Sequence, residues 1–216
     1  MSGQEEAPSI KTLAGQPLTV DRVVAFSDGV LAIAGTLLAF NIKAPAQLDV
    51  SFWLLLGQIW PQVQSYIISF VVVGIYWNSH HRLFSILERV DGTLIWLNLL
   101  FLALICLLPF ATSLIGGDRP ASATVSFYAL IVALIGYSHS ALWFKAMQSP
   151  SLLIKSGLDL ESRVRYGVRL LTPTYFLLSI WTAQYNPVLA TISWFGLSIL
   201  LPVTRLIMRR ILTRKT

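Results

Sequence analysis

Long uncharged runs of apolar residues recur along the chain and predict six membrane-spanning helices. The runs cover residues 22–42, 52–78, 94–115, 123–146, 166–184 and 187–207. Each run is close to the roughly 20 residues that a helix needs to cross a bilayer. The last two form one uncharged stretch that is too long for a single crossing, and Asn186-Pro187 supplies a turn signal near its middle.

This pattern predicts an all-α, polytopic membrane protein with one transmembrane domain at residues 21–208. A short polar lead at residues 1–20 precedes the domain, and a basic tail at residues 209–216 follows it. The lead contains charged residues and prolines but no continuous apolar run, which argues against a cleaved signal peptide.

The composition agrees with a bilayer environment, since 55% of the residues are hydrophobic and only 12% are charged. A soluble domain carries about 25% charged residues, so an ordinary soluble enzyme, a disordered protein and a coiled coil are excluded. The single cysteine, Cys106, excludes an intramolecular disulfide and a cysteine-based metal site. No P-loop, GxSxG, HExxH or TVGYG filter motif occurs, so an enzymatic function has little support.

The positive charges gather on one side of the predicted topology. Of the 16 Lys and Arg residues, all but Lys43 and Arg119 fall on the side of the two termini. Because Lys and Arg stay preferentially on the cytoplasmic side, both termini are expected in the cytoplasm. The net charge of +6 follows from this asymmetry and requires no nucleic-acid partner.

The first predicted helix carries two ionisable residues near its cytoplasmic end. Arg22 and Asp28 lie about a turn and a half apart, at a depth where a charge is tolerated only if it is paired, hydrogen-bonded or in contact with water. Asp28 is therefore either a cation site or gate element, or a structural partner of Arg22 or of polar side chains on neighbouring helices. Intramembrane charges usually need partners first, which favours the structural role.

An apolar stripe follows one side of the same helix. Ile33, Leu37 and Phe40 recur at the spacings i, i+4 and i+7, and Thr36 lies just beside them. The stripe is either ordinary packing or lipid contact, or an apolar constriction that gates a pore by excluding water. The flanking surface carries small residues that allow another helix to approach closely: Gly29, Ala32, Gly35 and Ala39.

Polar residues also occur inside the other predicted helices. His80 and His81 project about 100° apart, which suits one zinc ion poorly and favours a polar cluster that anchors helix ends and responds to pH. His139 either relays protons or forms a hydrogen bond across helices, and the hydrogen bond is the preferred interpretation. Asn98 requires a partner at its depth, and Pro109 is expected to kink the third helix.

Three segments together resemble a known family. They are Arg22–Gly29, which reads RxxxFSDG, Tyr76–Phe84 and Asn98–Thr112. Roughly the first half of the chain is similar to the lysosomal and endosomal potassium channels, the transmembrane protein 175 family, and in particular to their bacterial homologues. The resemblance implies six helices per subunit, a homotetramer, and a pore lined by four copies of the first helix.

The resemblance also implies roles for individual residues. It implies a hydrophobic gate at Ile33, further constriction layers at Leu37 and Phe40, and a potassium-selecting layer at Thr36. Asn41 stands where these bacterial helices commonly carry Glu. The motif segments are implied to form a structural network that includes Arg22, Phe26, Ser27, Asp28, Gly29, Trp77, His80, His81 and Asn98.

The expected function is a potassium channel of modest selectivity in the plasma membrane of a bacterium, with three further copies of itself in a homotetramer and the lipid bilayer as partners. No cofactor and no metal are expected apart from the permeating potassium ion. A proton-conducting or secondary cation transporter and a nonconducting membrane scaffold remain as alternatives. A transporter would require a coupling carboxylate near the bilayer midplane, where the deep segments offer only His139.

Overall fold

The computed structural model describes residues 19–45, 49–117, 121–154 and 160–194, the last with side chains from residue 169 onward, and regular structure in these ranges is helical. Residues 187–194 form a helical segment after the named elements. The predicted all-α class is confirmed. The elements are α2 (Val20–Leu37), the 3₁₀ turn η1 (Leu38–Asn41), α3 (Phe52–Phe84), α4 (Gly92–Ile115), α5 (Ser122–Gln148), the 3₁₀ turn η2 (Pro150–Leu152) and α6 (Leu160–Tyr185).

Four helical stretches in the described ranges are long and apolar enough to cross a membrane: α2 with η1, α3, α4 and α5. The next helix, α6, does not reach the same apolarity, because its first turns carry charges and its later turns several polar residues. Residues 195–207 of the predicted sixth span lie outside the described residues, as do most of the predicted lead and the whole basic tail. The count of six spans therefore stays a prediction.

The second helix of the bundle, α3, is longer than the uncharged run that predicts it. α3 continues past residue 78 to Phe84, and both His80 and Phe84 are buried there. The predicted span stops at the first cluster of polar residues, whereas the helix continues through it and packs His80, Leu83 and Phe84 into the protein. A polar cluster therefore marks the end of an apolar run more reliably than the end of a helix.

The chain reverses direction at Asn186, between α6 and residues 187–194. Asn186 Oδ1 accepts hydrogen bonds from the N–H groups of Val188 and Leu189, each at 3.1 Å. Pro187 follows as the first helical residue, where its missing N–H has no partner to lose. Tyr175 then donates to the carbonyl of Ser193 at 2.9 Å, which holds the returning segment against α6.

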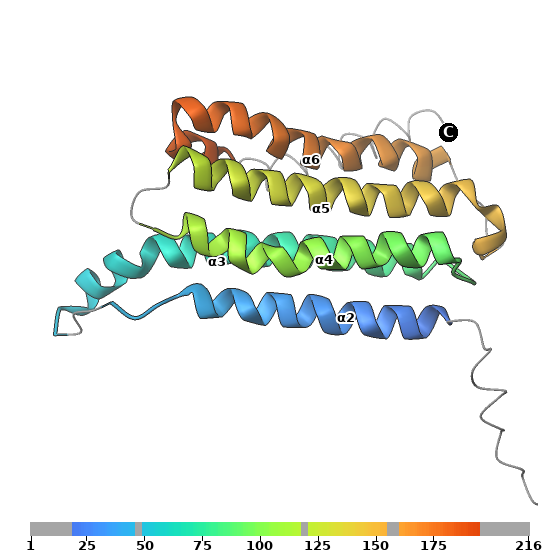
Figure 1. The fold of residues 1–216 in the computed structure, drawn as a ribbon, viewed down its shortest axis with the longest axis horizontal. Coiled ribbons are helices and arrows are strands. Elements are labelled where there is room, and N and C mark those ends of the chain that lie inside the picture. Colours follow the sequence, from blue (N-terminus) through green and yellow to red (C-terminus); the bar gives the residue numbers. More distant parts are fainter. Residues whose placement is uncertain (1–18, 46–48, 118–120, 155–159, 195–216) are drawn as a thin grey trace, which may run out of the picture.

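The helices lie side by side and alternate in direction (Figure 1). α2 lies at one edge of the bundle, α3 and α4 follow, and α5 separates these from α6. Among the four apolar stretches α5 buries the largest share of its residues, since α4 and α6 cover it from two sides. α2 has contacts with α3 and α4 on one side, and its opposite side is exposed in the single chain.

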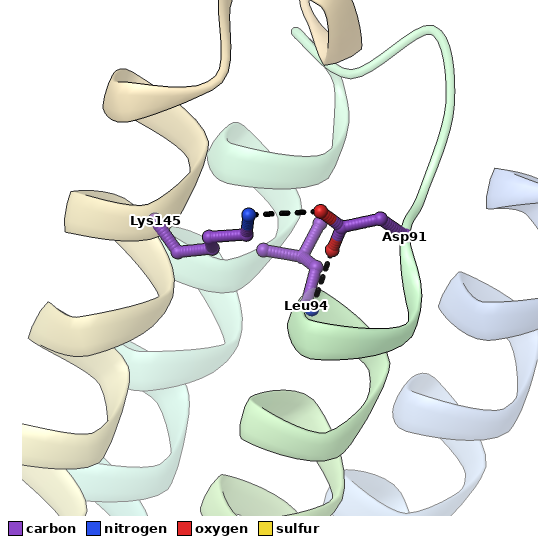
Figure 2. Close-up of polar contacts among 3 residues, drawn as sticks. All are labelled: Asp91, Leu94 and Lys145. Atoms are coloured by element: carbon purple, nitrogen blue, oxygen red, sulfur yellow. Dashed lines mark hydrogen bonds and ion pairs between the residues drawn. The ribbon is translucent and has the colours of Figure 1, made fainter.

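An ion pair ties the start of α4 to the end of α5. Lys145 Nζ lies 2.9 Å from Asp91 Oδ2, and the other carboxylate oxygen of Asp91 accepts the N–H of Leu94 at 2.8 Å (Figure 2). Asp91 is therefore both the N-cap of α4 and the partner of a lysine on α5. The hydrogen bond from Lys145 lowers the pKa of Asp91 below its ordinary value, and the bond from Leu94 acts in the same direction.

The loops at this end of the bundle also pair with each other. The N–H of Glu88 donates to the carbonyl of Leu152 at 2.8 Å, and the N–H of Ile154 donates to the carbonyl of Ile86 at 3.0 Å. Leu87 and Leu153 form an isolated antiparallel bridge between these bonds, and both side chains are buried. Backbone and side-chain contacts together therefore fix the α3–α4 turn against the end of α5.

Asp91→Asn is expected to destabilise the protein in a way that depends on pH. The folded-state pKa lies below the unfolded value of about 3.9, so the charge adds stability above that value and loses it as the pH falls through the lowered folded-state pKa. Near neutral pH the loss should be about 0.2–1 kcal/mol, as for other partly exposed ion pairs. Thermal unfolding in detergent from about pH 7 to about pH 3 measures it.

Glu88→Gln is the matched control for this substitution. The Glu88 side chain is exposed, and among the described residues its carboxylate has only a long 3.9 Å contact with the neighbouring Arg89. The control should leave the unfolding midpoint unchanged. A deficit of Asp91→Asn that stays constant down to the lowest pH would contradict an electrostatic role for Asp91.

Candidate functional site

The helix α2 has two faces of different character. One face packs into the bundle through buried residues at helical spacing, and Gly35 on this face lies beside Phe70 of α3, where a Cβ would be 3.7 Å from the ring, an ordinary van der Waals distance. The opposite face is exposed over its full length. The buried residues of α2 and η1 are Val23, Ser27, Leu31, Ala34, Gly35 and Leu38.

The apolar stripe predicted on α2 lies on its exposed face. Ile33 is 60% exposed, Leu37 45% and Phe40 79%. Thr36 is exposed on the same side, and its hydroxyl donates to the carbonyl of Ile33 at 2.8 Å, which leaves the hydroxyl oxygen free to accept. In the single chain this face therefore presents large apolar side chains and the hydroxyl oxygen of Thr36.

Motif residues at the other end of the stripe divide between the two faces. Phe26 is 56% exposed and Arg22 and Gly29 are exposed as well, whereas Ser27 is fully buried. A Cβ built on Gly29 would meet nothing within 4 Å. Space inside one chain therefore gives no reason for a glycine at this position.

A chain of buried hydrogen bonds attaches α2 to the bundle. Asn98 Nδ2 donates to Ser27 Oγ at 2.9 Å, and Ser27 Oγ donates to the carbonyl of Val23 at 2.7 Å. Because the amide nitrogen is used in this way, Asn98 Oδ1 is the acceptor at 2.8 Å from His80 Nε2, so His80 carries its hydrogen on Nε2. Side chains from α2, α3 and α4 thus meet in one network, and the partner that Asn98 was predicted to require is present.

Stacked rings surround the histidine of this network. The ring of His80 stacks on Phe84 with centroids 4.3 Å apart and on Phe101 at 5.7 Å. His139 of α5 packs against the same Phe101 at 5.2 Å and against Tyr76 at 5.5 Å. Within the described residues its buried Nε2 atom has no hydrogen-bond partner, so aromatic contact rather than a hydrogen bond from this nitrogen holds the ring there.

His81 and Asp28 occupy the surface beside the buried network. His81 is exposed and stacks on Trp77, with ring centroids 6.1 Å apart, so the two adjacent histidines point in different directions as predicted. Trp77 Nε1 donates to Asp28 Oδ1 at 3.0 Å. Within the described residues Asp28 forms no ion pair with Arg22, so its partner is the polar side chain of a neighbouring helix.

A second buried polar cluster was not identified from the sequence. Thr112 Oγ1 lies 2.7 Å from Ser69 Oγ, and Ser69 Oγ lies 3.1 Å from the hydroxyl of Tyr128, with all three residues fully buried. Tyr128 also stacks on Trp194 at 5.0 Å. The only signal in the sequence was that each of the three apolar runs contains hydroxyl residues, which is typical of helix contacts in membranes but does not single out these three.

The fold and this site define a multi-pass helical membrane protein with one helix attached by polar contacts and exposed on its other face. Residues 22–109 match the family model described as "Endosomal/lysosomal potassium channel TMEM175". A potassium channel of Streptomyces collinus is 41% identical over 128 residues, which cover 57% of this chain and 62% of that relative. The matched part is thus less than two thirds of that protein.

A potassium channel of Chamaesiphon minutus is 32% identical over 173 residues, which cover 74% of this chain and 85% of that relative. A crystal structure of a lysosomal potassium-selective channel TMEM175 homolog from the same organism superimposes with a TM-score of 0.73 at 29% identity, and covers 86% of this chain and 97% of that one. The chain therefore belongs to the TMEM175 family. This family consists of ion channels, not of enzymes.

Asn98→Leu is expected to weaken the attachment of α2. Leucine nearly matches the volume of asparagine but leaves His80 Nε2 and Ser27 Oγ without their partner in a buried place. Unpaired buried polar groups cost about 1–3 kcal/mol each, so the unfolding midpoint in detergent should fall clearly. Asn78→Leu makes the same replacement at an exposed position of α3 and should not lower the midpoint. Equal midpoints for the two variants would contradict the role assigned to Asn98.

Proposed function

We propose that the chain is a subunit of a potassium-permeable cation channel whose pore is lined by α2 from four identical copies. The observation that carries the proposal is the exposed apolar face of α2, which includes Ile33, Leu37 and Phe40. The names of the bacterial relatives, which are potassium channels, support the choice of ion.

The geometry of α2 supports a pore role over simple lipid contact. Helices α4 and α5 have exposed leucines as well, but α2 combines its apolar stripe with an exposed threonine, an exposed glycine and a charged end. Phe26, which is 56% exposed two turns before Ile33, extends the exposed apolar surface beyond the stripe to about 20 Å along the helix axis, a large part of the hydrocarbon core. Small residues beside the stripe, such as Ala32 and Ala39, would let neighbouring copies approach closely.

The proposed mechanism depends on wetting of an apolar ring. Four Ile33 side chains would form a narrow constriction, and its filling with water would set the barrier for an ion. The Thr36 hydroxyl oxygens, about one helical turn beyond Ile33, would favour cations, because the lone pairs of a hydroxyl oxygen can coordinate a positive ion. Without a cage of carbonyl oxygens the selectivity should be modest, and the weaker hydration of potassium would favour it over sodium.

The placement in the membrane is part of the proposal. The ends of α3 and α5 and the start of α4 lie together at one end of the bundle, where Arg82, Arg89 and Lys145 occur. The positive-inside rule makes this end cytoplasmic, and the bacterial relatives point to a plasma membrane. Lys43, after η1, would then lie on the outer side.

Ile33→Asn is expected to raise potassium current and to reduce the preference for potassium over sodium, because the amide makes the constriction easier to wet. The measurement is current and reversal potential of purified protein in liposomes under bi-ionic potassium and sodium. Leu178→Asn places the same amide on α6, at a side chain that is 65% exposed compared with 60% for Ile33. This control should behave as the unsubstituted protein.

Other outcomes would separate the alternatives. Saturable flux coupled to a second ion would indicate a transporter, and current carried by protons alone would indicate a proton pathway. Silent bilayers with well-folded protein would indicate a scaffold. If both asparagine variants changed the current to the same extent, Ile33 would not be the constriction.

A further inference from the structure

The outer end of α2 changes its winding at the last residue of the apolar stripe. The α-helix ends at Leu37 and continues as the 3₁₀ turn η1, with the N–H of Ile42 bonded to the carbonyl of Ala39 at 3.1 Å. In a 3₁₀ turn residues i and i+3 lie one above the other. Phe40 therefore stands directly above Leu37, whereas α-helical winding would rotate it by about 60° to one side.

The backbone decides the direction in which the Phe40 side chain leaves the helix. Phe40 is 79% exposed, so packing against the rest of the chain does not hold it in place. Its neighbour Leu38, by contrast, is fully buried. The direction of Phe40 thus depends on whatever keeps the segment from Leu38 to Asn41 in the tighter winding.

Two hydrogen bonds fix this segment, and each ends beside a proline inside a helix. Asn41 Nδ2 donates to the carbonyl of Pro109 in α4 at 2.8 Å. The N–H of Lys43 donates to Gln62 Oε1 in α3 at 2.6 Å, one residue after Pro61. The carbonyl that a proline leaves without a helical donor is the one four residues earlier, so Pro109 frees the carbonyl of Ile105 and not its own. A carbonyl oxygen has two lone pairs, and the carbonyl of Pro109 can therefore accept the amide of Asn41 in addition to a helical hydrogen bond.

We propose that Asn41 is a positioning residue that keeps Phe40 in line with Leu37 and so forms a second, outer constriction of the conduction path. The inference rests on the proposed channel function and adds a specific residue to it. Asn41 shares the 3₁₀ turn with Phe40 and lies on the other side of it, where it faces α4 instead of the exposed stripe. Its effect on ions is therefore indirect and requires the Phe40 ring.

The test combines Asn41→Leu, Phe40→Ala and the double variant in the full-length protein. Leucine keeps the size of asparagine but cannot donate to Pro109. Released from its anchor, η1 should relax toward α-helical winding and move Phe40 off the pore axis, which widens the outer constriction. Single-channel conductance in potassium should rise about twofold or more in each single variant, and the double variant should equal Phe40→Ala because the two changes act through one ring.

A merely structural role is distinguished by a matched control and a second readout. Ser113→Ala removes a 2.7 Å side-chain bond to the carbonyl of Phe110, on the same part of α4, without touching α2. This variant should keep the conductance of the unsubstituted protein. Hydrogen exchange followed by mass spectrometry should show faster exchange in Asn41→Leu at residues 38–43 and no change in α4.

The outcomes decide the anchor and the channel separately. Unchanged exchange at residues 38–43, or conductance effects of the two single variants that multiply in the double variant, would overturn the role of Asn41. A silent unsubstituted protein would overturn the channel proposal, and it would overturn the outer constriction with it. In that case the exchange data would still establish or reject the anchoring of η1 by Asn41.

Discussion

The position of α2 depends on one buried amide. Asn98 joins Ser27 of α2 to His80 of α3, and it does so in a part of the protein where water cannot replace a lost partner. A membrane gives helices no hydrophobic reason to choose one neighbour over lipid, so close packing and polar contacts select the arrangement. The network fixes the rotation of α2 about its axis, because only one face can present Ser27 to Asn98. That rotation turns the stripe of Ile33, Leu37 and Phe40 away from the bundle.

Polar contacts thus hold the helix near its two ends, and the face that turns away from the bundle is exposed between them. Ser27 and Asp28 bind partners on α3 and α4 near one end, and Asn41 binds α4 near the other. Between these points Gly35 of α2 packs beside the ring of Phe70, without a polar contact. Attachment at both ends, with one exposed face between them, is an arrangement that would suit a pore-lining helix. Its exposed side chains, Ile33 and Phe40 above all, must keep their place with little cover from the described residues.

Much of this arrangement could be predicted from the sequence, for identifiable reasons. Charge-free runs of membrane length indicated the helices, and the demand of Asn98 for a partner followed from its depth alone. The motif around Asp28 was recognisable because its residues are close together in sequence. The interaction of Asn98 with both Ser27 and His80 was not predictable in the same way, since it depends on how three helices rotate against one another.

Other features depended on tertiary contacts that leave a weak trace in the sequence. In the sequence Ser69, Thr112 and Tyr128 look like any other hydroxyl residue in an apolar run. Only the packed bundle brings the three together. The 3₁₀ turn at Phe40 has no signature of its own, and the bond between Asn41 and Pro109 joins residues that are far apart in the sequence. The apolar stripe stayed ambiguous for a related reason: periodicity defines a face of a helix but not what covers it.

Thiol accessibility shows whether the exposed face of α2 borders a water-filled path. Single cysteines at Ile33, Thr36, Leu37 and Phe40, and at the buried Leu31 and Leu38, would be introduced after Cys106→Ser and treated with a water-soluble thiol reagent during current recording. If this face borders the conduction path, the reagent should block current at the four exposed positions and leave it unchanged at the two buried ones. Block at the buried positions, or the same response at all six, would contradict it.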